Sequence, residues 1–220
     1  MTAPAQIEPQ EKQFVPSSEI IAANVSLDDY LEHYAAHHCE WVEGMVITMS
    51  PVHLRHDQIA AYLRLLFETY FEIRPIGRVV SEPFVLRLPE FPNRRREPDL
   101  MVVLDVNPHE LKDTYMDGPP DICIEVVSPE STARDHGEKF AEYEQGGAPE
   151  YWIIDPVRTE CRFYRRNDKG IYLRQPEDQQ GNYHTPTLPD LALPVPTLWQ
   201  EKLPGPAATV KAVQQMLETT

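Results

Sequence analysis

At 220 residues, the chain is long enough for one sizeable hydrophobic core, and its 41% hydrophobic and 25% charged residues are ordinary for a globular protein. The formal net charge of −15 argues against a broad basic face for nucleic acid, because phosphate binding normally needs clustered positive charge. No apolar run approaches the roughly 18 residues that span a bilayer, and the N-terminus lacks the features of a signal peptide. We therefore expect a cytoplasmic protein with no membrane segment.

Cysteines and basic residues narrow the function classes further. Cys39, Cys123 and Cys161 are far apart and form no Cys-x-x-Cys pair, so neither a disulfide framework nor a cysteine-rich zinc site is expected. Positive charge is sparse in the first fifty residues and concentrates in residues 94–96 and again between residues 158 and 166. A local positive patch is therefore compatible with the sequence, although the whole chain is acidic.

The N-terminal part predicts a tail, a helix, a hairpin and a longer helix. Residues 1–18 are polar and indicate a flexible tail. Ser26, with an acid three residues later, is typical of a helix start. Residues 40–49 predict two short strands that turn near Gly44, and an apolar stripe at helical spacing predicts a helix over residues 53–72.

The central part of the chain alternates strand-like and helical segments. Apolar stretches predict the strands, and a pair of glycines at residues 146 and 147 is typical of a helix end. The expected elements are strands at residues 77–88, 97–104 and 120–127, a helix at 135–145, a strand at 151–156, and a hairpin of 160–164 with 171–174. This order predicts an α/β fold with a mixed central sheet.

The C-terminal part is rich in proline. Six prolines between residues 186 and 206 predict an irregular segment on the surface, followed by a short helix at about residues 207–217. The chain as a whole therefore predicts a single domain over residues 19–203, with the flexible tail of residues 1–18 before it and a helix-bearing tail at residues 204–220 after it.

Two acids stand where their neighbours predict burial. Asp99 opens an apolar run and Glu125 interrupts another. Charged residues are rarely buried unless they are paired or bind a metal. Side chains alternate across a strand, so Asp99 shares a face with Met101, and Glu125 shares one with Cys123. If the two strands are adjacent, the acids lie within a few ångströms and can hold one divalent ion, in the manner that Mg²⁺ favours.

A lysine completes this candidate site. Lys139 lies four residues after Asp135 and four before Tyr143, so the three side chains share one face of the predicted helix. A lysine next to a metal orients the attacking water or stabilises the transition state, which points to phosphodiester hydrolysis. Taken alone, each residue has a simpler interpretation: a capped strand edge for Asp99, an arginine ion pair for Glu125, and a solvated helix position for Lys139.

Several short motifs occur together along the chain. They are Glu97-Pro98-Asp99, Glu125 to Thr132, Asp135 to Lys139, Tyr143, Gly147 to Pro156, and Glu43 to Pro51 with His56. Over about residues 26–200, this set resembles the Uma-two family of restriction endonucleases, within the PD-(D/E)XK nuclease superfamily. The set is more specific than any one of its members.

The resemblance implies a restriction-endonuclease-like core and assigns roles to the acids. Pro98 and Asp99 correspond to the "PD" of the motif, and Glu125 to its "(D/E)". The superfamily normally carries its lysine two residues after the second acid, where this chain has Val127. The resemblance implies that Lys139, on the following helix, takes the place of that lysine.

Other groups carry weaker signals. His56, at the start of the long predicted helix, is a candidate for accepting a proton or contacting phosphate. Residues 94–96 directly precede the Pro-Asp motif, and they either grip phosphates at the edge of a cleft or form a solvated loop that offsets the acidic charge. His33 and His37 have zinc-ligand spacing, but the third candidate, Cys39, lies where the helix should end, so an exposed polar helix face is the better interpretation.

The sequence therefore predicts a metal-dependent endonuclease that hydrolyses DNA with Mg²⁺ or Mn²⁺. The predicted catalytic residues are Asp99, Glu125, Lys139, His56 and Tyr143, and the predicted metal ligands are Asp99, Glu125 and the Val126 carbonyl. A homodimer is expected, because cutting both strands of a duplex calls for two sites related by a twofold axis. Two alternatives stay open: a non-catalytic interaction or regulatory protein that retains the nuclease fold, and a hydrolase of RNA or small phosphate compounds.

Overall fold

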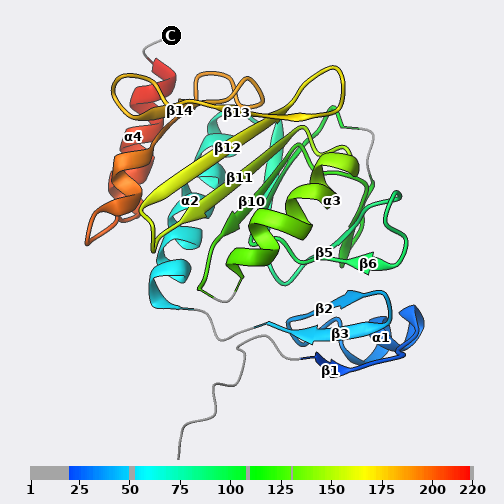
Figure 1. Cartoon of the computed structure of the whole chain (residues 1–220). Coiled ribbons are helices and arrows are strands. Elements are labelled where there is room, and N and C mark those ends of the chain that lie inside the picture. Colours follow the sequence, from blue (N-terminus) through cyan, green and yellow to red (C-terminus); the bar gives the residue numbers. More distant parts are fainter. Residues whose placement is uncertain (1–19, 50–52, 108–109, 130, 219–220) are drawn as a thin grey trace, which may run out of the picture.

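The computed structural model describes residues 20–49, 53–107, 110–129 and 131–218. The tail predicted for residues 1–18 lies outside the described residues. A small N-terminal unit sits beneath a larger body, in which helices cover both faces of a central sheet (Figure 1). No helix in these ranges is both long and apolar enough to cross a membrane.

The N-terminal unit is a four-stranded sheet with one short helix. Its elements are β1 (Ile20–Ala22), α1 (Leu27–His33), β2 (Cys39–Val42), β3 (Met45–Thr48) and β6 (Arg94–Arg95), with the strands in the order β1-β3-β2-β6. Helix α1 begins after Ser26, whose hydroxyl accepts a hydrogen bond from the backbone N–H of Asp29. The hairpin turns at Glu43 and Gly44, which both adopt the positive φ that a two-residue turn requires. The predicted helix start and hairpin are confirmed.

The central sheet has six strands and is mixed, as predicted. Its strands are β4 (Gly77–Ser81), β7 (Leu100–Leu104), β10 (Ile122–Val126), β11 (Glu150–Asp155), β12 (Glu160–Arg166) and β13 (Tyr172–Gln175). They are ordered β13-β12-β11-β10-β7-β4. Strands β10 and β11 pair in parallel and the other neighbours pair antiparallel. The parallel pair requires a crossover, which the helix after β10 supplies.

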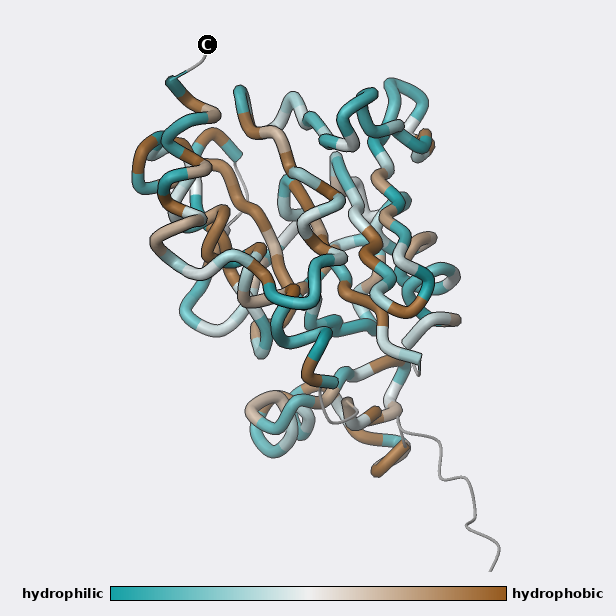
Figure 2. Tube along the Cα trace, turned by 90° about the vertical axis from the view of Figure 1, so that its left-hand side faces the viewer, coloured by the Kyte–Doolittle hydropathy of each residue, from teal (hydrophilic) through white to brown (hydrophobic). Residues whose placement is uncertain are grey.

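Each face of this sheet packs against its own helices because side chains alternate along the strands. One face carries Leu100, Val102 and Ile124 and packs against α2 (Leu54–Ile73), whose apolar side chains lie in the same buried cluster. The opposite face carries Met101 and Cys123, which lie in a second cluster with residues of α3 (Lys139–Gln145). Figure 2 shows the hydrophobic segments running through the middle of the molecule, with hydrophilic loops around them.

The segment predicted as one strand over residues 77–88 is two strands in different sheets. Strand β4 belongs to the central sheet, whereas β5 (Val85–Arg87) pairs with β9 (Tyr115–Asp117), which also pairs with β8 (Glu110–Leu111). The break falls at Pro83, which has no N–H to donate to a sheet ladder. The sequence prediction of a continuous strand was therefore wrong at this proline.

The proline-rich segment is not the irregular surface predicted from its composition. It contains β14 (Asn182–His184), β15 (Ala192–Pro194) and the short 3₁₀ helix η2 (Val195–Trp199). Its leucines at 188, 191, 193 and 198 are buried in the cluster that includes α2. Pro186 and Pro189 lie in turns, and the apolar residues that follow them reach the core, so proline count alone was a poor guide to exposure.

A buried carboxylate anchors this segment to the sheet. Glu150, at the start of β11, accepts hydrogen bonds from the Tyr183 hydroxyl at 3.0 Å, from the Thr187 hydroxyl at 2.6 Å and from the Thr185 hydroxyl. The Trp152 indole N–H donates to the same carboxylate at 2.9 Å. Because these donors satisfy the acid, its burial is tolerated and the segment is held against β11 and β12.

The last helix, α4 (Pro206–Glu218), corresponds to the helix predicted at about residues 207–217. It packs beside α2, and its residue Val213 is fully buried in the same cluster. Val210, three residues earlier on α4, is 37% exposed.

We predict that Val213→Asp lowers the free energy of unfolding by at least about 2 kcal/mol, because an unpaired carboxylate would enter an apolar cluster. Val210→Asp, on the same helix, should change it by less than about 0.5 kcal/mol. Urea denaturation followed by circular dichroism measures both values. Equal losses in the two variants would mean that α4 does not dock on α2 as described.

Candidate active site

Strands β7 and β10 bring the two predicted acids together. They pair antiparallel with Leu100 opposite Ile124, and one further step in this register puts Asp99 opposite Glu125. Opposite residues of an antiparallel pair lie on the same face. Both acids are buried, Asp99 at 6% and Glu125 at 3% exposure. The adjacency that the sequence analysis assumed is therefore present in the fold.

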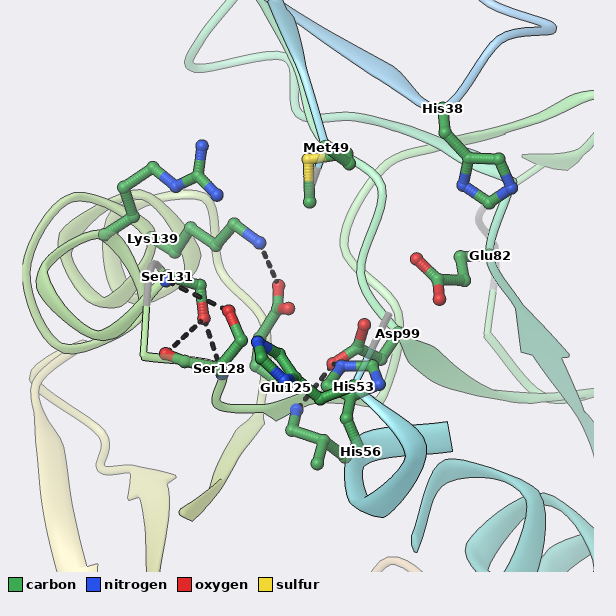
Figure 3. A pocket seen from close by; sticks show the side chains of 12 residues that line it. His38, Met49, His53, His56, Glu82, Asp99, Glu125, Ser128, Ser131 and Lys139 are labelled. Atoms are coloured by element: carbon green, nitrogen blue, oxygen red, sulfur yellow. Dashed lines mark hydrogen bonds and ion pairs between the residues drawn. The ribbon is translucent and has the colours of Figure 1, made fainter. Parts of the chain in front are cut away.

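The acids line a pocket of about 310 Å³. The pocket lies between the N-terminal unit, which contributes His38 and Met49, and the central sheet with its helices. Figure 3 shows the carboxylates of Asp99 and Glu125 directed into this space, with Lys139 approaching Glu125 from the helix side. The lining residues are His38, Met49, His53, His56, Glu82, Asp99, Glu125, Val126, Ser128, Ser131, Arg134 and Lys139.

Asp99 is oriented by two donors. Its Oδ2 accepts hydrogen bonds from the Val126 backbone N–H at 2.5 Å and from His56 Nε2 at 3.1 Å. Burial lowers the pKa of His56, but the hydrogen bond to Asp99 and the charge of that carboxylate outweigh burial, so the pKa is raised. His56 is thus placed beside Asp99 by the first turn of α2, and its contact here is with the carboxylate.

Lys139 is a fully buried ammonium group among carboxylates. Its Nζ lies 2.9 Å from Glu125 Oε1, and 3.4 Å from both Glu40 Oε1 and Asp135 Oδ1. Burial lowers the pKa of Lys139, but Glu125, Glu40 and Asp135 raise it well above the ordinary lysine range, so the amine stays charged. The Tyr143 hydroxyl donates to the same oxygen of Glu125 at 2.9 Å. The structure therefore brings together the lysine, the tyrosine and the second acid of the prediction.

A widened helical turn places Lys139. Before α3 the chain forms a π-helical turn, η1 (Arg134–Glu138), in which the Lys139 N–H donates to the Arg134 carbonyl five residues back. The Asp135 carbonyl accepts a hydrogen bond from the Tyr151 hydroxyl at 2.9 Å, and the Ser131 hydroxyl donates one to the Asp135 side chain. Such turns are often found at functional sites. Val127, at the position where the sequence analysis looked for a lysine, is buried in the apolar cluster that includes residues of α3.

Two charged residues next to this site, Glu40 and Arg96, were not identified as site residues from the sequence. Glu40, on β2, is fully buried, and its Oε2 accepts from Arg96 Nη1 at 2.8 Å. Arg96 also makes a two-pronged contact with Glu142 of α3, from Nε at 2.8 Å and from Nη2 at 2.6 Å. Burial raises the pKa of Glu40, but Lys139 and Arg96 outweigh it and lower the pKa to about 2. The available signal was an acid within the apolar run of β2, the same signal that marked Glu125.

The basic run at residues 94–96 fits neither interpretation drawn from the sequence. Arg96 is only 2% exposed and ion-paired. Arg95 is buried, and its guanidinium carbon lies 5.9 Å from the centre of the Trp41 ring. Arg94 pairs with Glu43 and with Glu142. Arg94 and Arg96 thus join the N-terminal unit to α3, whereas Arg95 packs within that unit. They are neither a solvated loop nor a free phosphate grip.

Carboxylates outnumber the cations around this pocket. Burial raises the pKa of Glu82, which lines the pocket, to about 7, with Asp99 adding to the effect. Burial and the charge of Glu40 raise the pKa of Glu97 to about 8, and neither oxygen of its buried carboxyl has a hydrogen-bond partner in the described part of the chain. Such a surplus of acid is the environment that a divalent cation relieves.

The donor set fits a hard divalent cation held by few protein ligands. Within the described ranges, the hydrogen bonds of Asp99 use only Oδ2 and those of Glu125 only Oε1, which leaves one oxygen of each for an ion. No three His, Cys, Asp or Glu side chains there form a complete cage. Mg²⁺ typically binds through one or two carboxylates, water and substrate phosphate, so two free carboxylate oxygens are a sufficient protein share.

His33 and His37, the two histidines with zinc-ligand spacing, do not line the pocket. His33 and His37 are exposed, whereas Cys39 is buried in the core of the N-terminal unit. Both histidines are exposed as expected, but they do not share a helix face, because α1 ends at His33 and His37 lies beyond it. The neighbouring His38 does line the pocket, a position that the sequence did not indicate.

Comparison with known proteins places the chain by family and by fold. The family model Uma2, described as "Putative restriction endonuclease", matches residues 27–196. The crystal structure of a protein described as a putative nuclease belonging to DUF820, from Anabaena variabilis, superposes with a TM-score of 0.65 at 19% sequence identity, covering 80% of this chain and 97% of that one. This likeness confirms the predicted restriction-endonuclease-like α/β fold. No curated protein matches the sequence.

We predict that Arg96→Met lowers the free energy of unfolding by about 3–5 kcal/mol, because it leaves the buried Glu40 and Glu142 without their partner. Arg78→Met is the matched control, since Arg78 pairs with Asp105 on the surface and its loss should cost less than about 1 kcal/mol. Chemical denaturation measures both. A loss in Arg96→Met no larger than in the control would show that the network adds nothing to stability.

Proposed function

Because the chain belongs to the Uma2 family, we propose that it is an endonuclease that hydrolyses phosphodiester bonds of DNA with the help of Mg²⁺ or Mn²⁺. The observation that carries the proposal is the pairing of Asp99 and Glu125 across two strands, with Lys139 Nζ 2.9 Å from Glu125, inside one pocket. This is the acid–acid–lysine set of the nuclease motif, assembled from β7, β10 and the start of α3.

The ion would be held by Asp99, Glu125 and the Val126 carbonyl. When bound, a divalent ion neutralises charge on the phosphate and lowers the pKa of a coordinated water. The Val126 N–H and His56 fix the orientation of the Asp99 carboxylate, and Tyr143 and Lys139 fix that of Glu125. Both acids are therefore preorganised, which is what a site must provide before the substrate arrives.

Lys139 supplies the positive charge of the reaction in this proposal. Its ammonium group stays protonated at neutral pH because Glu125, Glu40 and Asp135 surround it. A fixed ammonium beside the pocket orients the attacking water and stabilises the negative charge that grows on the phosphate. His56 and Tyr143 act as positioning residues for the two carboxylates.

DNA is proposed as the substrate from the family description, against an overall charge of −15. The local charge matters more than the total, because a bound divalent cation and Lys139 offset the acids that line the pocket. A cytoplasmic homodimer, with one site for each strand of a duplex, is part of the proposal. RNA and small phosphate compounds are the competing substrates in the test below.

We predict that Asp99→Asn lowers the rate of DNA cleavage at least about 100-fold, because an amide replaces a charged metal ligand of the same size. Asp105→Asn is the control, since Asp105 directly follows β7 on the surface and its carboxylate pairs with the exposed Arg78. The assay incubates each protein with plasmid, single-stranded DNA and RNA in Mg²⁺ or Mn²⁺, and thermal unfolding verifies that both variants fold.

Cleavage of RNA alone would replace DNA as the substrate. No cleavage of any of the three by the wild type, or equal rates in Asp99→Asn and Asp105→Asn, would overturn the proposed activity.

Metal removal gives an independent prediction. Chelation with EDTA should abolish cleavage, and added Mg²⁺ or Mn²⁺ should restore it. Titration calorimetry should detect Mn²⁺ binding to the wild type and to Asp105→Asn, but at least about tenfold weaker binding to Asp99→Asn, since one of two carboxylate ligands is lost. Equal Mn²⁺ affinity in all three proteins would rule out Asp99 as a ligand.

A further inference from the structure

Arg134 is placed in the pocket by the same π-helical turn that places Lys139. It is the first residue of η1 and lines the pocket together with Ser131 and Lys139. Its positive charge helps to lower the pKa of Glu40 and opposes the rise in that of Asp135, so it lies within electrostatic range of the acids. It is nevertheless bonded to neither of them.

The side chain of Arg134 has no bonding partner among the described residues. Its Nε is buried and makes no hydrogen bond, and no carboxylate in those ranges lies within 4.0 Å of its guanidinium group. Every other arginine of the chain forms an ion pair, a hydrogen bond or a ring contact. In the basic stretch noted in the sequence, Arg158 pairs with Asp155, and Arg162 with Glu160. As far as contacts among the described residues go, Arg134 thus differs from the other arginines.

The charges around the pocket explain what this guanidinium is suited to bind. Lys139 is ion-paired with three carboxylates, whereas Arg134 lines the same pocket and no described carboxylate pairs with it. A buried donor without a partner is unfavourable, and the planar guanidinium has the geometry to bind two oxygens of a phosphate at once. An anion that enters the pocket would satisfy this donor.

We propose that Arg134 is a substrate-binding residue that contacts a phosphate group of the nucleic acid in this pocket. The proposal rests on the proposed nuclease function and deepens it. Asp99 and Glu125 would hold the metal on the sheet side, Lys139 lies with Glu125, and Arg134 would bind the phosphate oxygens from the helix side. Its contribution is to binding and orientation and involves no proton transfer, because arginine stays protonated at neutral pH.

The test measures binding separately from cleavage. Arg134→Gln and Arg134→Lys are compared with the wild type and with Arg158→Gln, an exposed arginine outside the pocket. Fluorescence anisotropy measures the Kd for a labelled DNA duplex in Ca²⁺ over a range of salt concentrations, and cleavage is measured in Mg²⁺. Thermal unfolding checks that each variant folds, and Arg134→Lys keeps the charge if Arg134→Gln does not fold.

Loss of one phosphate contact has a defined signature. For Arg134→Gln we expect a Kd raised about tenfold on every DNA sequence, and a slope of log K against log salt reduced by about one. Arg134→Lys should lie between Arg134→Gln and the wild type, and Arg158→Gln should match the wild type. A merely structural role for Arg134 would leave the salt slope unchanged.

The outcomes separate this proposal from the proposed function. If the wild type binds DNA without cleaving it and Arg134→Gln loses affinity with the expected slope, the phosphate site stands and the nuclease activity fails. If Arg134→Gln binds with wild-type affinity and slope while the wild type cleaves, the phosphate site is overturned and the nuclease stands. Absence of DNA binding by the wild type overturns the phosphate site.

Discussion

A buried ammonium group has to be paired, and Lys139 obtains its partners from three different parts of the chain. Glu40 comes from the N-terminal hairpin, Glu125 from the central sheet and Asp135 from the turn before α3. The side chain is 1% exposed, so an incomplete set of partners would leave a charge without compensation. The position of the hairpin relative to the sheet and to α3 is therefore tied to one nitrogen atom.

Arg96 adds a second link between the N-terminal unit and α3. It links Glu40 to Glu142, and so connects β2 to α3 behind the lysine. Despite burial, the charges of Lys139 and Arg96 lower the pKa of Glu40, so that Glu40 stays ionised beside the lysine. Glu40 therefore takes part in two sets of contacts. Through Arg96 it links the N-terminal unit to α3, and through Lys139 it contacts a residue that lines the pocket.

The surplus of carboxylates is the feature that links stability to the proposed chemistry. Glu82 and Glu97 have raised pKa values because burial and neighbouring carboxylates outweigh the opposing charge of Lys139. Three further acids, Glu40, Glu125 and Asp135, share that one lysine. Such an arrangement is unfavourable in isolation and suits a cation and then an anionic substrate. In the proposed function, a very acidic chain acts on a phosphodiester through local charge, without a basic surface overall.

The sequence by itself indicated most strands of the central sheet, which residues share a strand face, and Asp99, Glu125 and Lys139 as candidate site residues. Burial of an acid within an apolar run was enough to mark Asp99 and Glu125, because charge among apolar neighbours on one strand is a local pattern. The same rule would have marked Glu40, had it been applied to β2. The part played by Arg94, Arg95 and Arg96 was not readable, since a solvated arginine and a buried paired one look alike without the partners.

Only the tertiary structure decided which charges meet. The partners of Lys139 lie 14 and 99 residues away in sequence, at Glu125 and Glu40, and pair through strand register and helix packing that no local pattern records. The burial of the leucines in the proline-rich segment was decided in the same way, by contact with α2 and the sheet. Local preferences set where helices and strands form, whereas pairing of charges and exposure of loops depend on neighbours that folding brings together.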